Sequence, residues 1–467
     1  MYNNYLNPMS TMKTNLCMTL FLIFGAAPIV PAAAADRMRV EKPNLVVIFI
    51  DDMGYGDIGP FGSKANKTPH LDRMAGEGLK LTSFYAAAPV CTPSRAALMT
   101  GCYPKRVGLA RGSWGIVLFP KDPHGLNPEE KTIAEVLQDA DYATGCFGKW
   151  HLGDQPEFLP TRHGFDIYFG IPYSNDMWPR MGGASRWKNG VCPLPLMRGG
   201  EVVDIVEDMD DQSRLCKLVT DEAVGFIRMN KDKPFFCYIP HAFMHGPRRA
   251  RPEFMKRAGG NATRAQIEEI DWSVGRILET IRESGLEEKT LVLFTSDNGA
   301  AGGSSGPLRG HKGQTWEGGM REPAVAWWPG TVPAGGACDE IASTMDLLPT
   351  FARLAGAEVP GDRVIDGRDI SALLRDPDNA ESPHEAFFYF QTDRLSAVRS
   401  GKWKLHGNGQ LYDLENDVGE RNNVARRNPR IVAELKERMQ AFDAELTRNT
   451  RPVGKVKNPD YLVQEKR

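Results

Sequence analysis

Short apolar runs alternate with helical segments through most of the chain. Four runs have the length and β-branched content of buried strands: residues 44–50, 142–147, 234–239 and 290–296. Residues 132–140 and 267–281 instead place apolar side chains at helical spacing. Strands that alternate with helices are typical of an α/β fold, so we predict a large, mixed, mostly parallel sheet flanked by helices.

The pattern changes after about Leu374. Four short runs separated by turn residues predict strands: residues 387–391, 396–399, 403–406 and 410–414. Residues 431–446 have the spacing of an amphipathic helix. We therefore predict a main domain over residues 36–375 and a smaller C-terminal α+β domain with an antiparallel sheet over residues 376–467.

The first 35 residues have a different character, with Lys13 as their single charged side chain. An apolar run over residues 16–30 is followed by small residues up to Ala35, which is typical of a secretory signal peptide, with Met12 as a possible start. The run is shorter than the roughly 18–20 apolar residues that a membrane span needs. We therefore predict export to the periplasm, the exterior or a lysosomal-type lumen, with no membrane attachment after cleavage.

Charge and cysteine content exclude some classes of function and point to others. The chain has 57 Lys and Arg against 59 Asp and Glu, and its pI is near 6.5, which argues against nucleic acid as a partner. Without Cys17 of the signal peptide, seven cysteines remain. An odd number in an exported protein suggests that one of them has special chemistry.

Polar side chains gather where the four predicted strands end. They are Asp51 and Asp52, Lys149 and His151, His241 and His245, and Asp297 and Asn298. In open α/β sheets, ligands bind at the carboxyl ends of the strands. The sequence therefore predicts a polar site at this edge of the sheet.

Cys91 begins the segment Cys-Thr-Pro-Ser-Arg, which ends at Arg95. Pro93 suits the first turn of a helix and would place Cys91 at or just before a helix N-terminus, where negative charge is favoured. The local sequence leaves two interpretations open, a buried cysteine and a thiolate nucleophile of low pKa.

Six motifs together resemble the type I, formylglycine-dependent sulfatases. They are residues 51–57 (Asp-Asp-Met-Gly-Tyr-Gly-Asp), 91–101 (Cys-Thr-Pro-Ser-Arg, then Thr-Gly), 148–153 (Gly-Lys-Trp-His-Leu-Gly), 170–176 (Gly-Ile-Pro-Tyr-Ser-Asn-Asp), 295–299 (Thr-Ser-Asp-Asn-Gly) and 312–323 (Lys-Gly-Gln-Thr-Trp-Glu-Gly-Gly-Met-Arg-Glu-Pro). Residues 170–176 resemble the arylsulfatase A branch more narrowly. The resemblance implies an alkaline-phosphatase-like fold and hydrolysis of a carbohydrate or aryl sulfate monoester. It also implies that a formylglycine-generating, or sulfatase-maturating, enzyme converts Cys91 to Cα-formylglycine before folding.

The resemblance implies a metal site as well. Its ligands would be Asp51, Asp52, Asp297 and Asn298, with the residue derived from Cys91. Hard oxygen ligands suit Ca²⁺ or Mg²⁺, and the family favours calcium. Three carboxylates this close would repel one another without a cation.

The same resemblance assigns roles to basic and hydroxyl side chains. Lys149 and Lys312 would hold sulfate oxygens, and Arg95 would orient the formylglycine hydrate and the neighbouring acids. Ser174 stands where the arylsulfatase A branch uses a serine in the sulfate pocket, although a plain turn hydroxyl remains the alternative.

Histidines titrate near neutral pH and suit proton transfer. His151 would be the base that helps to expel sulfate, and His245 the acid on the leaving alcohol. Many family members have Pro-His-x-Pro at the latter position, whereas this chain has His241-Ala-Phe-Met-His245-Gly-Pro. Because His245 keeps the proline two residues later, we prefer it to His241.

Two other functions compete with sulfate hydrolysis. One is a phosphoester or phosphonate hydrolase of the same superfamily, and the other is an inactive carbohydrate-binding relative. The segment 177–200 carries Trp178, Arg186 and Trp187, which could stack on and pair with an acidic sugar or form a packed lid. We favour a carbohydrate sulfate over a small aryl sulfate.

Overall fold

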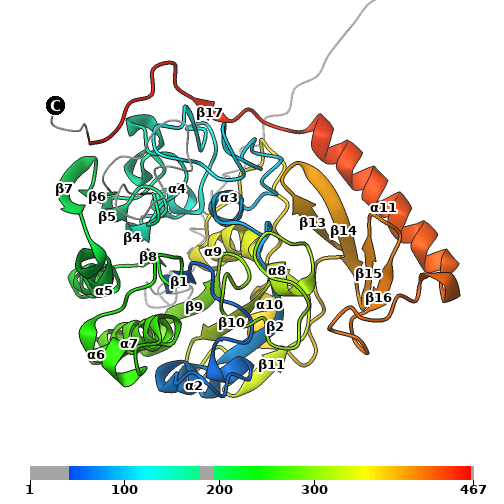
Figure 1. The fold of residues 1–467 in the computed structure, drawn as a ribbon, viewed down its shortest axis with the longest axis horizontal. Helices are drawn as coiled ribbons and strands as arrows, with labels where there is room; N and C mark the ends of the chain where they lie inside the picture. Colours follow the sequence, from blue (N-terminus) through cyan, green and yellow to red (C-terminus); the bar gives the residue numbers. More distant parts are fainter. Residues whose placement is uncertain (1–41, 178–193, 464–467) are drawn as a thin grey trace, which may run out of the picture. The chain divides into compact units, whose positions relative to one another are not determined.

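The computed structural model describes residues 42–177 and 194–463. Its main sheet has eleven strands in the order β11-β2-β10-β9-β1-β8-β4-β5-β6-β7, and β12 pairs with β2 (Figure 1). The strands are β1 (Asn44–Ile50), β2 (Leu79–Tyr85), β4 (Ala143–Lys149), β5 (Ile167–Ile171), β6 (Leu194–Arg198), β7 (Glu201–Val206), β8 (Phe235–Pro240), β9 (Thr290–Ser296), β10 (Arg321–Trp327), β11 (Gly336–Cys338) and β12 (Ala342–Ser343).

The centre of this sheet is parallel and its flanks are mixed. Strands β9, β1, β8, β4 and β5 run parallel to one another, whereas β10 is antiparallel to both β9 and β2. Strands β5, β6 and β7 pair antiparallel at the other flank. The predicted fold class is therefore confirmed, and the four predicted central strands are present as β1, β4, β8 and β9.

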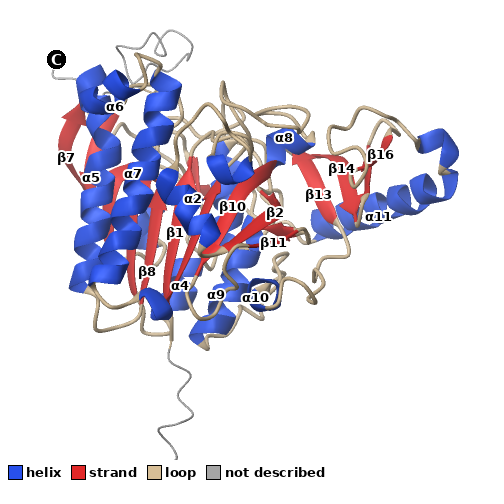
Figure 2. Cartoon of the chain, turned by 90° about the horizontal axis from the view of Figure 1, so that it is seen from below, coloured by secondary structure: helices blue, strands red, loops and turns tan. Residues whose placement is uncertain are grey.

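Helices cover both faces of the sheet (Figure 2). One core combines alternate β1 side chains such as Val47 with α3 (Cys91–Thr100), α4 (Ile133–Gln138), α9 (Leu347–Ala355) and α10 (Ser371–Arg375). The opposite core combines the intervening β1 side chains such as Ile48 with α2 (Pro69–Gly76), α5 (Met209–Met229) and α7 (Ala262–Glu283). Because side chains alternate between the faces of a strand, β1 needs apolar residues at every position after Asn44.

Helix termini follow from local chemistry. Thr132 caps α4 rather than joining it, since its hydroxyl accepts the Glu135 N–H and the Glu135 carboxylate accepts the Thr132 N–H. The side chain of Asn261 caps α7, so that helix begins before the apolar stripe that predicted it. Two further short helices are α6 (Pro252–Arg257) and α8 (Glu317–Met320).

A separate antiparallel sheet follows near the C-terminus, as predicted. It consists of β13 (Phe387–Gln391), β14 (Arg394–Ser400), β15 (Trp403–His406) and β16 (Leu411–Asp413), and α11 (Pro429–Arg448) packs against it (Figure 1). The chain then returns to the main part, where β17 (Gly454–Lys455) pairs with β3 (His124–Gly125). The domain boundary near residue 375 stays a prediction, since residues 42–467 form one compact unit.

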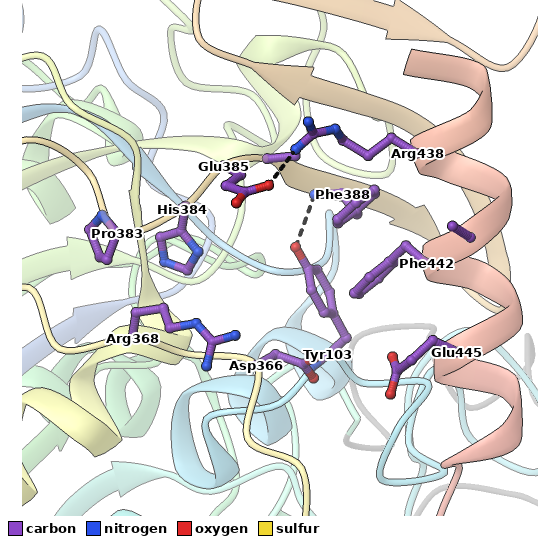
Figure 3. A pocket seen from close by; sticks show the side chains of 12 residues that line it. Tyr103, Asp366, Arg368, Pro383, His384, Glu385, Phe388, Arg438, Phe442 and Glu445 are labelled. Atoms are coloured by element: carbon purple, nitrogen blue, oxygen red, sulfur yellow. Dashed lines mark hydrogen bonds and ion pairs between the residues drawn. The ribbon is translucent and has the colours of Figure 1, made fainter. Parts of the chain in front are cut away.

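Polar and aromatic contacts join the small sheet to the segment after α3. The Tyr103 hydroxyl accepts the Phe388 N–H at 2.9 Å, and the Phe388 ring stacks on Phe442 of α11 with centroids 3.8 Å apart. The buried Arg106 guanidinium bridges Asp366 and Glu445. These contacts surround a cavity of about 490 Å³ (Figure 3). The small sheet is thus fixed at the C-terminal end of the helix that begins with Cys91.

Two sequence predictions lie outside the described residues. They are the signal peptide at residues 1–35 and the tryptophan-containing segment at residues 178–193. Among the helices that the structure does describe, none combines the length and the apolar character needed to cross a bilayer.

Candidate active site

The four central strands bring their polar ends together, as their parallel order requires. Strands β9, β1, β8 and β4 are consecutive neighbours, so their carboxyl ends meet at one edge of the sheet. The residues that follow them are Asp297 and Asn298, Asp51 and Asp52, His241 and His245, and Lys149 and His151. The backbone of Asp52 (φ 65°) and of His151 (φ 61°) is left-handed, a conformation that residues other than glycine rarely adopt.

Cys91 is the first residue of α3 and points into this cluster. Its side chain is buried, with 3% of the residue exposed, and its thiol is free. Burial raises the pKa of Cys91, and the positive charges of Lys149 and Lys312 only partly oppose that effect. The unmodified cysteine is therefore a neutral thiol, which argues against the thiolate interpretation.

Arg95 lies one helical turn beyond Cys91 and is fully buried. Its Nε and one terminal nitrogen donate to the same oxygen of Asp297, at 3.1 and 2.8 Å, and its other terminal nitrogen donates to the Lys149 carbonyl at 2.8 Å. Arg95 thereby links α3 to the carboxyl ends of β9 and β4.

The acidic side chains form a candidate metal centre. Ligand atoms of Asp51, Cys91 and Asp297 all lie within 4.8 Å of one another. Asp51 Oδ1 and Asn298 Oδ1 are buried and have no hydrogen-bond partner. Burial, followed by repulsion from Asp51, raises the pKa of Asp297, despite its contact with Arg95. Free oxygen donors and mutually repelling carboxylates are what a hard cation such as Ca²⁺ or Mg²⁺ would satisfy, so the donor set fits the predicted metal.

Asp52 joins this cluster to Lys312. Its Oδ1 accepts from Lys312 Nζ at 2.5 Å and from Asn298 Nδ2 at 2.8 Å, while its backbone N–H donates to Asp297. Burial by itself lowers the pKa of Lys312, but Asp52, Cys91, Asp51 and Asp297 together outweigh burial and raise it. Lys312 is therefore a cation that also lines a cavity of about 590 Å³ formed by residues 300–312.

Lys149 contacts both Asp51 and Ser174. Lys149 Nζ donates to Asp51 Oδ2 at 2.5 Å and to the Ser174 hydroxyl at 3.2 Å. The Ser174 hydroxyl is also 3.4 Å from His245 Nδ1. Ser174 is thus placed with two of the predicted site residues rather than at an isolated turn.

His151 is neutral and has one free nitrogen. Burial, with a further contribution from Lys149, holds the pKa of His151 well below its usual value. Its Nε2 lies 2.9 Å from the Leu118 carbonyl, which can only accept, so Nε2 carries the proton. Its buried Nδ1 has no partner and keeps a lone pair that can take a proton.

The two histidines after β8 face different surroundings. His245 Nδ1 is 2.7 Å from the Gly246 carbonyl and its Nε2 is 3.8 Å from Asp52 Oδ2, with 15% of the side chain exposed. His241 is buried, its Nε2 contacts the Ser273 hydroxyl of α7 at 3.1 Å, and burial lowers its pKa to about 4. The structure therefore brings His245, and not His241, to the cluster.

Sequence reasoning assigned no role to Glu322, although it lies inside the last of the six motifs. Both of its carboxylate oxygens are buried without a hydrogen-bond partner, and burial raises its pKa well above the usual value. The negative charges of Asp297 and Asp52 raise that pKa further. Nothing in the local sequence distinguishes this glutamate from an exposed one.

Two protein-family models match this chain. The sulfatase family model matches residues 43–357, and the model of the N-sulphoglucosamine sulphohydrolase C-terminal region matches residues 311–445. The chain is 38% identical to human arylsulfatase A over 471 residues, which cover 89% of this chain and 90% of that protein.

Two solved structures are also similar over most of their length. Ps i-CgsB in complex with k-i-k-neocarrahexaose is 31% identical, with a TM-score of 0.76 over 88% of this chain and 94% of that chain. The PsFucS1 sulfatase from Pseudoalteromonas sp. is 28% identical, with a TM-score of 0.80 over 92% and 94%. The chain is therefore an enzyme of the sulfatase family.

Proposed function

We propose that this enzyme hydrolyses a sulfate monoester to an alcohol and inorganic sulfate, with Cys91 converted to Cα-formylglycine and with calcium as its metal. The observation that carries this proposal is the grouping of Cys91 with Asp51 and Asp297, whose ligand atoms lie within 4.8 Å. Asp52 and Asn298 complete the oxygen donors that would hold the ion. When present, calcium neutralises the carboxylates and the hydrated aldehyde at position 91 supplies the nucleophile for sulfur.

The two lysines bind the sulfate group in this proposal. Lys149 and Lys312 are each 2.5 Å from a different carboxylate, Asp51 and Asp52, so they approach the cluster from two sides. A cation that binds the carboxylates would free ammonium hydrogens for sulfate oxygens. Lys149 Nζ also contacts the Ser174 hydroxyl, which offers a further hydrogen-bond donor in the same pocket. These donors stabilise the charge that develops on the sulfate oxygens.

Arg95 and the histidines complete the mechanism. Arg95 orients Asp297 and the end of β4 and does not need to move. His151, neutral and with a free Nδ1, accepts a proton at that atom when sulfate is released. His245, partly exposed beside Ser174, donates a proton from its ring to the leaving alcohol oxygen.

For the substrate we propose a sulfated saccharide. The similar Ps i-CgsB structure holds a neocarrahexaose, and the cavity of about 590 Å³ beside Lys312 leaves room for more than a sulfate group. We also propose that the enzyme is exported. A formylglycine-generating enzyme would act on the unfolded chain, because Cys91 is inaccessible after folding.

The experiment is a comparison of protein made with and without a maturating enzyme. We expect the peptide that contains Cys91 to change from cysteine to formylglycine mass, and aryl sulfate turnover to rise with the modified fraction. Cys91→Ala should abolish turnover, whereas Cys102→Ala, which alters a buried free cysteine at the other end of α3, should retain it. Fully active protein with unmodified Cys91 would exclude formylglycine, and faster turnover of aryl phosphate than of aryl sulfate would favour the phosphoester alternative.

A further inference from the structure

Lys312 lies on a loop and not on a regular element, between β9 and α8. Its side chain is 20% exposed and spans from the cavity to Asp52. A lysine side chain is long and flexible, so the position of its ammonium depends on how firmly the backbone below it is held. The contacts of this loop therefore decide where the ammonium lies.

The main part of the molecule holds one side of the loop. The Lys312 N–H donates to the Ala300 carbonyl at 3.1 Å, and the Gly313 N–H donates to the Pro89 carbonyl at 2.8 Å. Pro89 precedes Cys91 by two residues. These two hydrogen bonds fix the backbone at Lys312 relative to the start of α3.

The C-terminal sheet holds the other side. The side-chain amide of Gln391, the last residue of β13, donates to the Gly313 carbonyl at 2.9 Å. The N–H of Gly313, next to Lys312, is thus held by the segment before α3, and its carbonyl by the C-terminal sheet. Helix α8, which follows this loop, lies beside the C-terminal sheet (Figures 1 and 2).

A buried ionic cluster fixes the end of the same loop. The Glu317 carboxylate accepts from the hydroxyls of Tyr85 and Tyr389, at 2.6 and 2.8 Å, and from Lys404 Nζ at 2.8 Å. Lys404 Nζ is also 3.0 Å from Glu420, whose carboxylate accepts the Glu317 N–H at 2.7 Å. Tyr85 belongs to the main sheet, whereas the other partners come from the C-terminal segment.

The buried charges of this cluster stabilise one another. A buried charge that loses a partner is strongly unfavourable, and Lys404 is the nearest cation to Glu317. Around the same turn, the Arg309 guanidinium stacks 3.7 Å from the Trp316 ring and donates to the Glu420 carbonyl. The loop from Arg309 to Glu317 is therefore held by the C-terminal sheet near both of its ends.

We propose that the C-terminal sheet positions Lys312 for sulfate binding, with Gln391 and the Glu317–Lys404 pair as its positioning residues. The proposal rests on the proposed function only in that Lys312 is taken to hold the sulfate group. The small sheet would then set the geometry of a group that touches the substrate, without itself contributing to the reacting atoms.

Gln391 is the residue for the test, because it is half-buried and its loss leaves no buried charge. Gln391→Ala removes the contact with Gly313, and Gln391→Glu keeps the size but cannot donate. Gln410→Ala is the matched control, since the side chain of this glutamine in the same subdomain hydrogen-bonds to Asn408 and Tyr412, away from Gly313. All variants are compared as mature, metal-loaded protein.

We expect both Gln391 variants to lower kcat/KM for a sulfate ester by roughly 2- to 10-fold, the loss of one ordinary hydrogen bond, with an unchanged melting temperature. The affinity for inorganic sulfate, measured by calorimetry, should weaken by the same factor. Lys312→Ala alone should lose roughly 10²- to 10³-fold. In the Lys312→Ala background, Gln391→Ala should then cost nothing more, because the group it positions is gone.

The outcomes separate the two proposals. Equal losses from Gln391→Ala with and without Lys312 would overturn the positioning role and indicate a general structural effect, as would a loss in Gln410→Ala. Unchanged kcat/KM and sulfate affinity in Gln391→Ala would also overturn it. If the wild-type protein binds sulfate but hydrolyses no sulfate ester, the proposed function fails while the affinities still decide the positioning role. A wild-type protein that binds no sulfate overturns both.

Discussion

Removing the His245 imidazole tests the assignment of the general acid most directly. The ring lies between the Gly246 carbonyl, the Ser174 hydroxyl and Asp52, and none of these groups depends on it alone. Asp52 keeps its contacts with Lys312 and Asn298, and Ser174 keeps Lys149. His245→Ala should therefore fold normally and change proton transfer specifically.

The expected magnitude depends on the leaving group. General-acid catalysis is worth ~10²–10⁴-fold when the leaving oxygen needs a proton, equivalent to roughly 3–5 kcal/mol of transition-state stabilisation. A sugar alkoxide needs that proton, whereas a nitrophenolate is stable without it. We expect a loss in that range with a sugar sulfate and a much smaller loss with 4-nitrophenyl sulfate.

The assay is kcat/KM for both substrates in three variants. His241→Ala is the matched control, because this buried histidine on the same segment contacts Ser273 and not the cluster. Any loss in His241→Ala should be the same for both substrates. His151→Ala should lower kcat for both substrates alike once sulfate release limits turnover, since its proton does not go to the leaving oxygen. Equal damage from His245→Ala to both substrates refutes the acid role, and a leaving-group dependence confined to His241→Ala would transfer that role to His241.

Three further predictions concern the metal, the ionic cluster and pH. Asp297→Asn should abolish activity and weaken calcium binding, measured by calorimetry, since it removes a charged ligand beside Asp51; full activity in protein shown to be metal-free would contradict the metal site. Lys404→Met should cost about 3–5 kcal/mol by removing the buried cation that Glu317 and Glu420 share, and the melting temperature should fall by roughly 3–6 °C; an unchanged melting temperature would contradict this cost. Burial alone would lower the pKa of His384, but the charge of Asp346 at 2.7 Å raises it, so this ion pair stabilises the fold below about pH 6.5 and is lost as the pH rises through the folded-state pKa. The melting-temperature deficit of His384→Gln should accordingly be larger near pH 5.5 than near pH 8.5, and an equal deficit at both would contradict the linkage.

The central strands were predictable because burial on both faces leaves a continuous apolar run. β1 and β9 have their predicted bounds for that reason. The strand β2 was missed, since half-buried residues such as Lys80 and Thr82 interrupt its apolar pattern. The strand β10 was missed because it begins inside a motif that was interpreted only as chemistry, with Arg321 and Glu322 at its start.

The site was predictable to the extent that it follows strand ends. Parallel neighbours bring their carboxyl ends together, so the sequence could place Asp51 near Asp297 without knowing the fold in detail. The contact of Gln391 with Gly313 joins residues 78 positions apart, from the C-terminal sheet to the loop before α8, and no local pattern encodes it. The separation of His245 from His241 likewise depends on the packing of α7 beneath the latter.

The late pairing of β17 with β3 has a consequence for how the enzyme is made. Roughly 360 residues separate Cys91 from β17, and these take about 20 to 70 seconds to synthesise at about 5–20 residues per second. The sheet that holds Lys312 and the strand that closes the chain back onto the main part both emerge near the end of that interval. Cys91 thus leaves the ribosome long before the last contacts of its pocket can form. In the proposed maturation of Cys91, the order of elements along the chain leaves the maturating enzyme most of the synthesis time to reach a cysteine that the finished fold encloses.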